Sequence, residues 1–276
     1  MVEWKEKFLE RYGKLTDIDK FIEASMRPLP KTLRVNTLKT TVAEMKLRMK
    51  LAPIAWCKEG FTTEGFALGN SLEHFLGYYY LQGAASMIPP VVLAPEEDEL
   101  VLDMCASPGS KTSQMAAMMN NRGLIVANDN QISRLKPLTI NLQRCGVANT
   151  VVSLMHGQGF RNIQFDRILL DAPCSGIGTI RKSYKTIEIW NPNFSHKMAN
   201  LQKSLFFTAF DCLRPGGTLV YSTCTLEPDE DEAVVDDMLQ RYPNLKLQKI
   251  SLDIKASKPV EEFNRRSYSS EIKKCL

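Results

Sequence analysis

Two cysteines follow apolar runs that are predicted to be buried strands. Cys174 lies in DAPCSG, directly after the run DRILL, and Cys224 lies in TLVYSTCT, fifty residues later. Each is in a polar turn beside small residues, where a thiol is available for reaction. Thiolate addition to carbon 6 of cytosine makes carbon 5 nucleophilic enough to take a methyl group, and a second thiol can act as the base of the later elimination. The pair is compatible with covalent catalysis on a pyrimidine; the alternative is that both thiols, like Cys57, Cys145 and Cys212, are small buried apolar residues.

Other strand ends carry residues that suit the same chemistry. Asp171 can hydrogen-bond or protonate nitrogen 3 of the ring and offset the charge that develops there. The segment DMCASPGSKT lacks both the GxGxxG fingerprint and the P-loop order, but its Pro-Gly turn lets backbone N–H groups approach a ligand closely. Asp129 follows roughly 20 residues later, where an acidic side chain meets a ribose diol in dinucleotide folds. A nucleoside cofactor such as S-adenosylmethionine fits both features; the alternative is a tight turn with an N-capping aspartate.

The elements that would position these residues alternate regularly along the chain. Strands are predicted at residues 99–104, 124–129, 150–154, 166–171, 218–224 and 245–251, with helices between them. Strict alternation favours an α/β fold with a doubly wound, mostly parallel, Rossmann-like sheet. Ligands of such sheets bind beyond the carboxyl ends of the strands, which is where the residues named above fall.

The first part of the chain has a different pattern. Two short helical patterns, a proline-rich stop at RPLPK, a strand at TLRVNTL and a further helix indicate a small α+β unit. We therefore predict an N-terminal accessory domain for RNA recognition over residues 1–80 and a catalytic domain over 81–276.

Composition sets broad limits. The chain has 276 residues, 44% of them hydrophobic, and a formal net charge of +4, which permits a nucleic-acid partner without requiring one. Seven cysteines without CxxC spacing argue against a zinc site or a disulfide framework, so we expect no metal and reduced thiols in the cytoplasm. The charged amphipathic start argues against a signal peptide, and no apolar run approaches the ~20 residues of a spanning helix. We expect a monomer with no membrane partner.

Several motifs resemble one known family. DMCASPGSKT, LLDAPCSGIGTIRK and LVYSTCTLEPDEDEAVV are similar to motifs of the Sun/Nop family of RNA (cytosine-5) methyltransferases, and TLRVNTLK and YYLQGAASMIPP are similar to its upstream signatures. The paired DAPCSG and STC are highly specific. Within the family, the chain most resembles the bacterial small-subunit rRNA methyltransferase F type.

The resemblance assigns roles that the residues alone leave open. It implies that Cys224 attacks carbon 6 and that Cys174 assists product release, whereas DNA cytosine-5 methyltransferases use the Pro-Cys cysteine as nucleophile. It places Lys111 close to cofactor and active site; the alternative for Lys111 is a lysine on a helix surface. The implied binding residues for S-adenosylmethionine are Cys105, Ala106, Ser107, Pro108, Gly109, Ser110, Lys111, Asp129, His156 and Asp171.

Basic and polar residues suggest where RNA binds. Arg34 and Asn36 in TLRVNTLK are predicted to belong to an RNA-contact strand. Arg181 and Lys182, after the active-site loop, are predicted to hold a phosphate next to an extruded base. The alternative for each is a solvated surface side chain, and Trp190 is predicted to be a packing residue.

Two departures from the family pattern motivate a competing interpretation. His156 stands where family members carry an aspartate that meets the adenine amino group; a neutral imidazole can accept the same hydrogen bond. The family usually continues to a GFFxA strand, whereas this sequence stops at EIKKCL; if the chain is truncated, a sheet edge is left open. The alternative function is a catalytically weak RNA-binding remnant, and the RNA acted on is either rRNA or tRNA.

Overall fold

A sheet of five parallel strands forms the centre of the computed structural model, which describes residues 3–64 and 67–274. The strand order is β7–β6–β5–β8–β9. The strands are β5 (Leu100–Asp103), β6 (Leu124–Asp129), β7 (Thr150–Leu154), β8 (Phe165–Asp171) and β9 (Leu213–Ser222). All four neighbouring pairs run parallel, so the predicted doubly wound α/β fold is confirmed.

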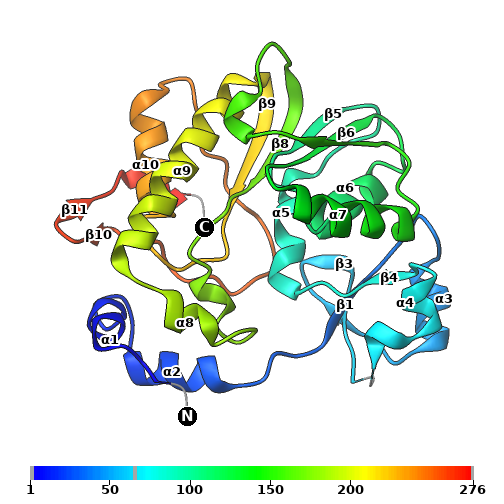
Figure 1. Ribbon diagram of the computed structural model, residues 1–276, viewed down its shortest axis with the longest axis horizontal. Helices are drawn as coiled ribbons and strands as arrows, with labels where there is room; N and C mark the ends of the chain where they lie inside the picture. The colour runs from blue at the N-terminus through cyan, green and yellow to red at the C-terminus, as the bar shows by residue number, and fades with distance from the viewer. Residues whose placement is uncertain (1–2, 65–66, 275–276) are drawn as a thin grey trace.

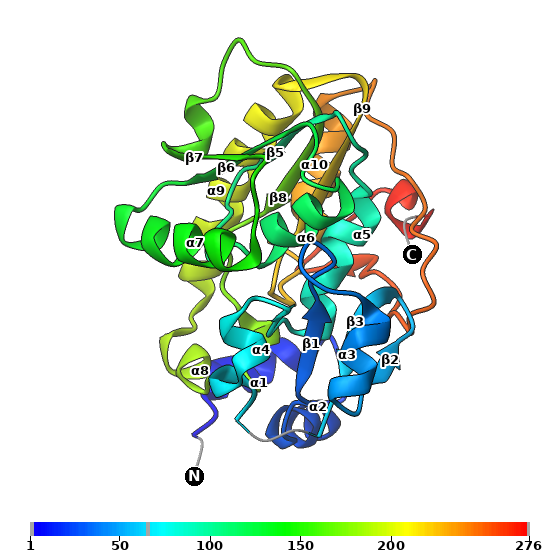
Figure 2. The ribbon, with the colours of Figure 1, turned by 90° about the vertical axis from the view of Figure 1, so that its right-hand side faces the viewer.

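Helices cover both faces of this sheet (Figures 1 and 2). One face carries α5 (Ile88–Leu93), α6 (Ser110–Met118) and α7 (Ile132–Cys145), and the other carries α9 (Pro192–Asp211) and α10 (Glu232–Arg241). Alternate residues of a strand face opposite layers. Val101 accordingly packs with Met115 of α6, while Leu102 packs with Leu205 of α9.

The strand order reverses between β5 and β8. The chain runs outward from β5 through β6 to β7, then returns to β8 on the other side of β5. A crevice opens beyond the carboxyl ends of the strands at such a switch point, and ligands bind there.

The N-terminal part forms a second, smaller sheet. Its antiparallel strands lie in the order β2 (Ala52–Ile54), β3 (Cys57–Thr62), β1 (Thr32–Val35) and β4 (Tyr79–Tyr80). The sheet packs with α3 (Val42–Arg48), and the short α4 (Leu72–Phe75) lies between β3 and β4 in the chain. Its core contains Leu33, Val35, Met45, Phe61 and Tyr79. The division at residues 80 and 81 stays a proposal.

Among the described residues, the first two helices pack against a later segment of the chain and not with the core of the N-terminal sheet. Helices α1 (Glu6–Tyr12) and α2 (Ile18–Met26) lie against the segment that holds the 3₁₀ turn η4 (Ile177–Thr179) and α8 (Lys185–Ile189). Trp190 is 2% exposed and stacks edge-on against Phe8 and Tyr12. Its predicted role in packing is confirmed, and so is the burial of Cys57, Cys145 and Cys212.

The predicted sixth strand is wrong. Residues 245–251 form no strand, because Leu245 packs against the main core and Leu247 packs beside α10 instead of extending the sheet. The chain then forms a hairpin of β10 (Glu262–Phe263) and β11 (Arg266–Ser267) and the turn η5 (Ser270–Lys274). Cys275 and Leu276 lie outside the described residues.

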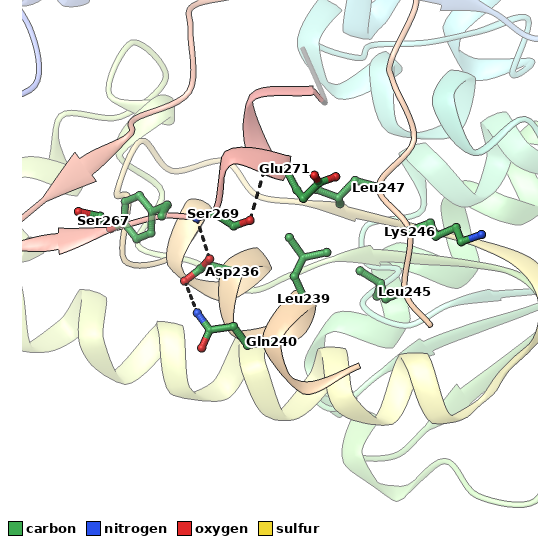
Figure 3. A pocket seen from close by; sticks show the side chains of 10 residues that line it. Asp236, Leu239, Gln240, Leu245, Lys246, Leu247, Ser267, Ser269 and Glu271 are labelled. Atoms are coloured by element: carbon green, nitrogen blue, oxygen red, sulfur yellow. Dashed lines mark hydrogen bonds between the residues drawn. The ribbon is translucent and has the colours of Figure 1, made fainter. Parts of the chain in front are cut away.

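A pocket of about 710 Å³ lies between α10 and this last segment (Figure 3). Asp236 accepts hydrogen bonds there from the backbone N–H of Ser269 and from Gln240, both at 2.9 Å. The pocket contains none of the predicted site residues, so the chemistry must be sought at the strand ends.

Candidate active site

The carboxyl ends of β8 and β9 bring the two predicted thiols together. The Sγ atoms of Cys174 and Cys224 are 3.0 Å apart, and the backbone N–H of Cys224 also donates to Sγ of Cys174 at 3.3 Å. Both cysteines are free thiols. Because β8 and β9 are adjacent and parallel, the loops that follow them meet at one edge of the sheet.

Polar contacts hold the two loops side by side. The hydroxyl groups of Ser175 and Thr225 are 2.7 Å apart, and the backbone N–H of Gly178 donates to the carbonyl oxygen of Cys224 at 2.9 Å. A Cβ atom at residue 178 would lie 2.9 Å from that same oxygen, so the close approach requires glycine.

The thiols differ in proton affinity. A hydrogen bond from Cys174 is the main cause that lowers the pKa of Cys224; Lys111 and Lys182 also lower it, and burial and Asp171 oppose them. The same hydrogen bond and burial raise the pKa of Cys174. The pair therefore favours a thiolate on Cys224 and a thiol on Cys174. Cys224 is also the more exposed of the two.

A lysine and a carboxylate lie beside the thiols. Nζ of Lys111, on α6, forms a salt bridge with Oδ2 of Asp171, at the end of β8, and their side chains are 14% and 30% exposed. The other oxygen, Oδ1, accepts a hydrogen bond from the hydroxyl of Ser222 at 2.8 Å. Asp171 is thus fixed at the mouth of the site, with part of its surface open to a ligand.

The loop between β5 and α6 is shaped by its own backbone. Gly109 has a φ of 96°, in the left-handed region that favours glycine, and an added Cβ would meet Leu138 at 3.0 Å. Hydrogen bonds tie the loop to its surroundings, among them those from the N–H of Ala106 to the carbonyl of Asn128 and from the hydroxyl of Ser107 to the carbonyl of Arg134. Burial raises the pKa of Cys105, which disfavours its thiolate form.

Two buried carboxylates near this loop fit a ligand that carries hydroxyl or amino groups. Asp129 is 2% exposed; Oδ1 accepts the N–H of Gln131 at 3.2 Å, and Oδ2, 3.5 Å from Nε of Arg134, has no hydrogen-bond partner in the described structure. Oδ1 of Asp103 likewise has none, and burial raises the pKa of Asp103 to about 7. Unsatisfied buried acceptors are rare and indicate an absent partner, which suits a ribose diol.

His156 lies after β7, at the start of the 3₁₀ turn η3 (Gly157–Gly159). Its side chain is exposed, and its backbone carbonyl accepts the N–H of Gly159 at 2.8 Å. The predicted contact between His156 and an adenine amino group stays a prediction.

Arg34 and Asn36, which are predicted to contact RNA, have buried side chains with exposures of 1% and 0%, so neither side chain offers a surface to RNA in this structure. Arg34 donates to Oε1 of Gln82 at 2.8 Å and to the hydroxyl of Ser113 on α6 at 2.9 Å. Asn36 donates to the carbonyl of Cys145, at the end of α7, at 2.8 Å. The two residues join the N-terminal sheet to helices that flank the loop between β5 and α6.

The second predicted RNA-binding pair is at the surface. Arg181 is exposed but donates to the carbonyl oxygens of Arg27 and Pro28 at 2.9 and 2.7 Å, so part of its donor capacity is used within the chain. Lys182 is exposed and acts electrostatically on Cys224. Contacts of these two residues with RNA stay predictions.

Sequence reasoning missed the buried acids behind Cys224. Glu227 and Glu230 are both 0% exposed, although they lie in the acid-rich segment 227–232 that leads into α10. Glu227 accepts hydrogen bonds from Arg11, Tyr12 and Trp190. The available signal was the number of acids, since five in six residues exceed what one helix N-terminus needs.

Comparison with known proteins identifies the family. The family described as 16S rRNA methyltransferase RsmB/F matches residues 90–273. This chain belongs to that family. The N-terminal domain of 16S rRNA methyltransferase RsmF matches residues 4–84. The Sun/Nop resemblance that the motifs carry is thereby confirmed.

Two relatives of this RsmB/F-family chain are named for the reactions that they catalyse. It is 44% identical over 280 residues to the tRNA (cytosine(49)-C(5))-methyltransferase of Pyrococcus abyssi, covering 98% of this chain and 90% of that protein. It is 44% identical over 241 residues to the ribosomal RNA small subunit methyltransferase F of Escherichia coli, covering 82% of this chain and 50% of that protein. The chain therefore spans about half the length of the F-type relatives.

Solved structures share the fold. A methyltransferase homolog protein from Pyrococcus horikoshii has a TM-score of 0.81 and 35% identity, over 98% of this chain and 92% of that one. NSun6 from the same organism, crystallised with SFG, has a TM-score of 0.84 and 24% identity, over 92% of this chain and 91% of that one. SFG is an analogue of S-adenosylmethionine, the cofactor of the family.

Proposed function

We propose that this chain transfers a methyl group from S-adenosylmethionine to carbon 5 of a cytosine in RNA, through a covalent bond between Cys224 and the base. The observation that carries the proposal is the pair of Sγ atoms 3.0 Å apart in the loops that follow two adjacent strands, with Lys111 of α6 and Asp171 at the end of β8 beside them. A protein that only binds RNA has no need of this arrangement. The activities of the two relatives support the same reaction.

Attack on the ring uses the thiolate of Cys224. Its sulfur adds to carbon 6, and the electron pair of the C5–C6 double bond becomes available at carbon 5. Lys111 and Lys182 lower the pKa of this thiol, which raises the thiolate fraction near neutral pH. When Asp171 carries a proton, it donates a hydrogen bond to nitrogen 3 of the ring and stabilises the charge that develops on attack.

The cofactor is held by the loop of residues 105–111, by Asp129 and by Asp171. When bound, it supplies the electrophilic methyl group that carbon 5 attacks. Asp129 receives the ribose hydroxyls, because its buried Oδ2 lacks a hydrogen-bond donor in the described structure.

Product release uses Cys174. As a thiolate, Cys174 takes the proton from carbon 5; the electron pair of that C–H bond restores the C5–C6 double bond, and the C6–S bond breaks to free Cys224 as a thiolate. This returns the pair to its resting arrangement, in which Cys174 is the thiol that donates to Cys224. Cys174 must lose its proton between attack and release, so each turnover discharges one proton to solvent.

The nature of the RNA is the finer part of the proposal. The relatives act on tRNA and on small-subunit rRNA, so these are the two substrates to compare. Across the part of the chain that is described, no helix has both the length and the apolar character that crossing a bilayer requires. The expected monomeric state and cytoplasmic location stay predictions, to be checked by analytical ultracentrifugation and cell fractionation.

The test is transfer of a tritiated methyl group from S-adenosylmethionine to purified tRNA and to small-subunit rRNA, followed by mapping of 5-methylcytosine. Transfer to carbon 5 by the wild-type protein is expected. In the variant Cys174→Ala, methylated RNA should stay attached to Cys224 and migrate slowly on a denaturing gel, and this band should disappear in the double variant with Cys224→Ala. Binding of RNA without transfer would instead support the remnant interpretation.

A further inference from the structure

A buried carboxylate and an amide hold the turn that carries Cys174. Oε2 of Glu230 accepts the backbone N–H of Ser175 at 2.9 Å and the Nε2 group of Gln202 at 2.9 Å. The same Nε2 group donates to the carbonyl oxygen of Pro173, also at 2.9 Å. The residues on both sides of Cys174 are therefore tethered by one side-chain pair.

The two side chains come from different elements. Gln202 lies in the middle of α9, and Glu230 lies in the loop between β9 and α10, six residues after Cys224. The hydroxyl of Tyr221, on β9, donates to the backbone carbonyl of Glu230 at 2.5 Å and fixes that loop in turn. Glu230 thus links the loop of one thiol to the turn of the other.

This link carries an energetic cost within the fold. Both side chains are 0% exposed, and their remaining oxygens, Oε1 of Glu230 and Oε1 of Gln202, have no hydrogen-bond partner in the described structure. Burial also raises the pKa of Glu230, because it disfavours the charged form. An apolar pair of the same size would avoid these costs, so the polar pair is retained for the contacts it makes to the turn.

We propose that Glu230 and Gln202 are positioning residues for product release, because they hold the Pro173–Cys174–Ser175 turn so that the Cys174 thiol stays against Sγ of Cys224. The inference rests on the proposed function and adds residues that touch neither base nor cofactor. Loss of the pair should let the turn move, lengthen the S–S separation and impair the step that needs Cys174. Attack by Cys224 should slow, because this thiol loses the hydrogen bond that lowers its pKa, but it should not stop, since the nucleophile itself remains.

The experiment uses the full chain and four variants. Glu230→Ala and Gln202→Met remove the tether, Glu230→Gln keeps an oxygen that can accept the N–H of Ser175, and Met238→Ala is a stability control in the main core on α10. Each protein is incubated with S-adenosylmethionine and with the RNA on which the wild type is active. We expect covalent protein–RNA adduct to rise several-fold above wild type in Glu230→Ala and Gln202→Met. Adduct should stay near the wild-type level in Glu230→Gln and Met238→Ala.

A second readout is independent of RNA. The rate at which iodoacetamide alkylates Cys224 is followed against pH by mass spectrometry of the peptide. Loss of the Cys174 hydrogen bond should move the midpoint upward in Glu230→Ala, in the same direction as in Cys174→Ala. Glu230→Gln should keep the wild-type midpoint.

The outcomes separate the two proposals. If Cys174→Ala accumulates adduct while Glu230→Ala behaves like Met238→Ala in both readouts, the positioning role is overturned and the function stands. If no protein transfers methyl groups or forms adduct, the proposed function fails, and the alkylation midpoints alone decide whether Glu230 positions Cys174. An unchanged midpoint in Glu230→Ala then overturns the inference.

Discussion

The ends of β8 and β9 and the strand β1 both carry polar residues in conspicuous motifs, but the fold uses them differently. At the strand ends, Cys224 is exposed and Asp171 is 30% exposed, with surface left for a ligand. In β1, Arg34 is buried and donates its hydrogen bonds to Gln82 and Ser113. A polar residue in a specific motif can therefore perform chemistry or hold together the parts that do. Exposure and hydrogen-bond partners distinguish the two uses.

The largest expected effect concerns the strand ends. Cys224→Ala should reduce methyl transfer by more than about a thousandfold, because the nucleophile is lost. Cofactor affinity should be unchanged, since the thiol acts on the base. Single-turnover transfer and calorimetric titration with S-adenosylmethionine measure the two quantities. Normal turnover would show that Cys224 has a structural role, like Arg34 in β1, and no catalytic one.

The matching experiment on β1 is Arg34→Met. It removes the guanidinium and leaves Oε1 of Gln82 without its donor, so the free energy of unfolding should fall by about 3 kcal/mol. Urea denaturation measures this, with the exposed Lys182→Ala as control, for which the change should stay within about 0.5 kcal/mol. A variant that keeps its stability but loses RNA affinity would return Arg34 to the RNA-binding residues.

A substitution in the loop between β5 and α6 should have an intermediate effect on stability and on cofactor affinity. Gly109→Ala forces a φ of 96° on a residue with a side chain and brings Cβ to 3.0 Å from Leu138. The strain should cost about 1–2 kcal/mol and weaken binding of S-adenosylmethionine, because the loop shifts to relieve it. Calorimetry and thermal unfolding follow both. Unchanged affinity would mean that binding of S-adenosylmethionine does not depend on the conformation of this loop.

A buried carboxylate beneath that loop gives a pH-dependent effect. The pKa of Asp103 is raised from 3.8 to about 7, so between these values the folded protein holds a proton that the unfolded chain releases. This contribution to stability is present at low pH and is lost as the pH rises toward 7. Asp103→Asn removes the titration. Unfolding at several pH values from about 4 to 7 should show the variant gaining stability relative to wild type as pH rises.

The smallest effect belongs to the surface. Lys182→Ala should reduce the slope of log affinity for RNA against log salt by about 1, as expected for one lost phosphate contact. Filter binding at several salt concentrations measures the slope. An unchanged slope would restrict Lys182 to its electrostatic effect on Cys224.

The sequence pattern alone predicts the α/β alternation and the five parallel strands. It also predicts that Asp129, Asp171, Cys174 and Cys224 lie at strand ends. These follow from local periodicity and from the geometry of parallel sheets. The strand predicted for residues 245–251 does not form, because Leu245 packs against the main core and Leu247 packs beside α10. An alternation of apolar and polar residues predicts a strand but does not specify which surface the apolar side chains will pack against.

Only the tertiary structure decided which polar groups are buried and with what partners. Arg34 looks like a surface base-contact residue until α6 supplies Ser113, and Glu230 looks like an exposed helix-start acid until Ser175 and Gln202 surround it. The same holds for the thiols, because a hydrogen bond across fifty residues makes Cys224 the better thiolate. Burial and hydrogen bonding between distant segments fix solvation and pKa, and neither is encoded in the spacing of a motif.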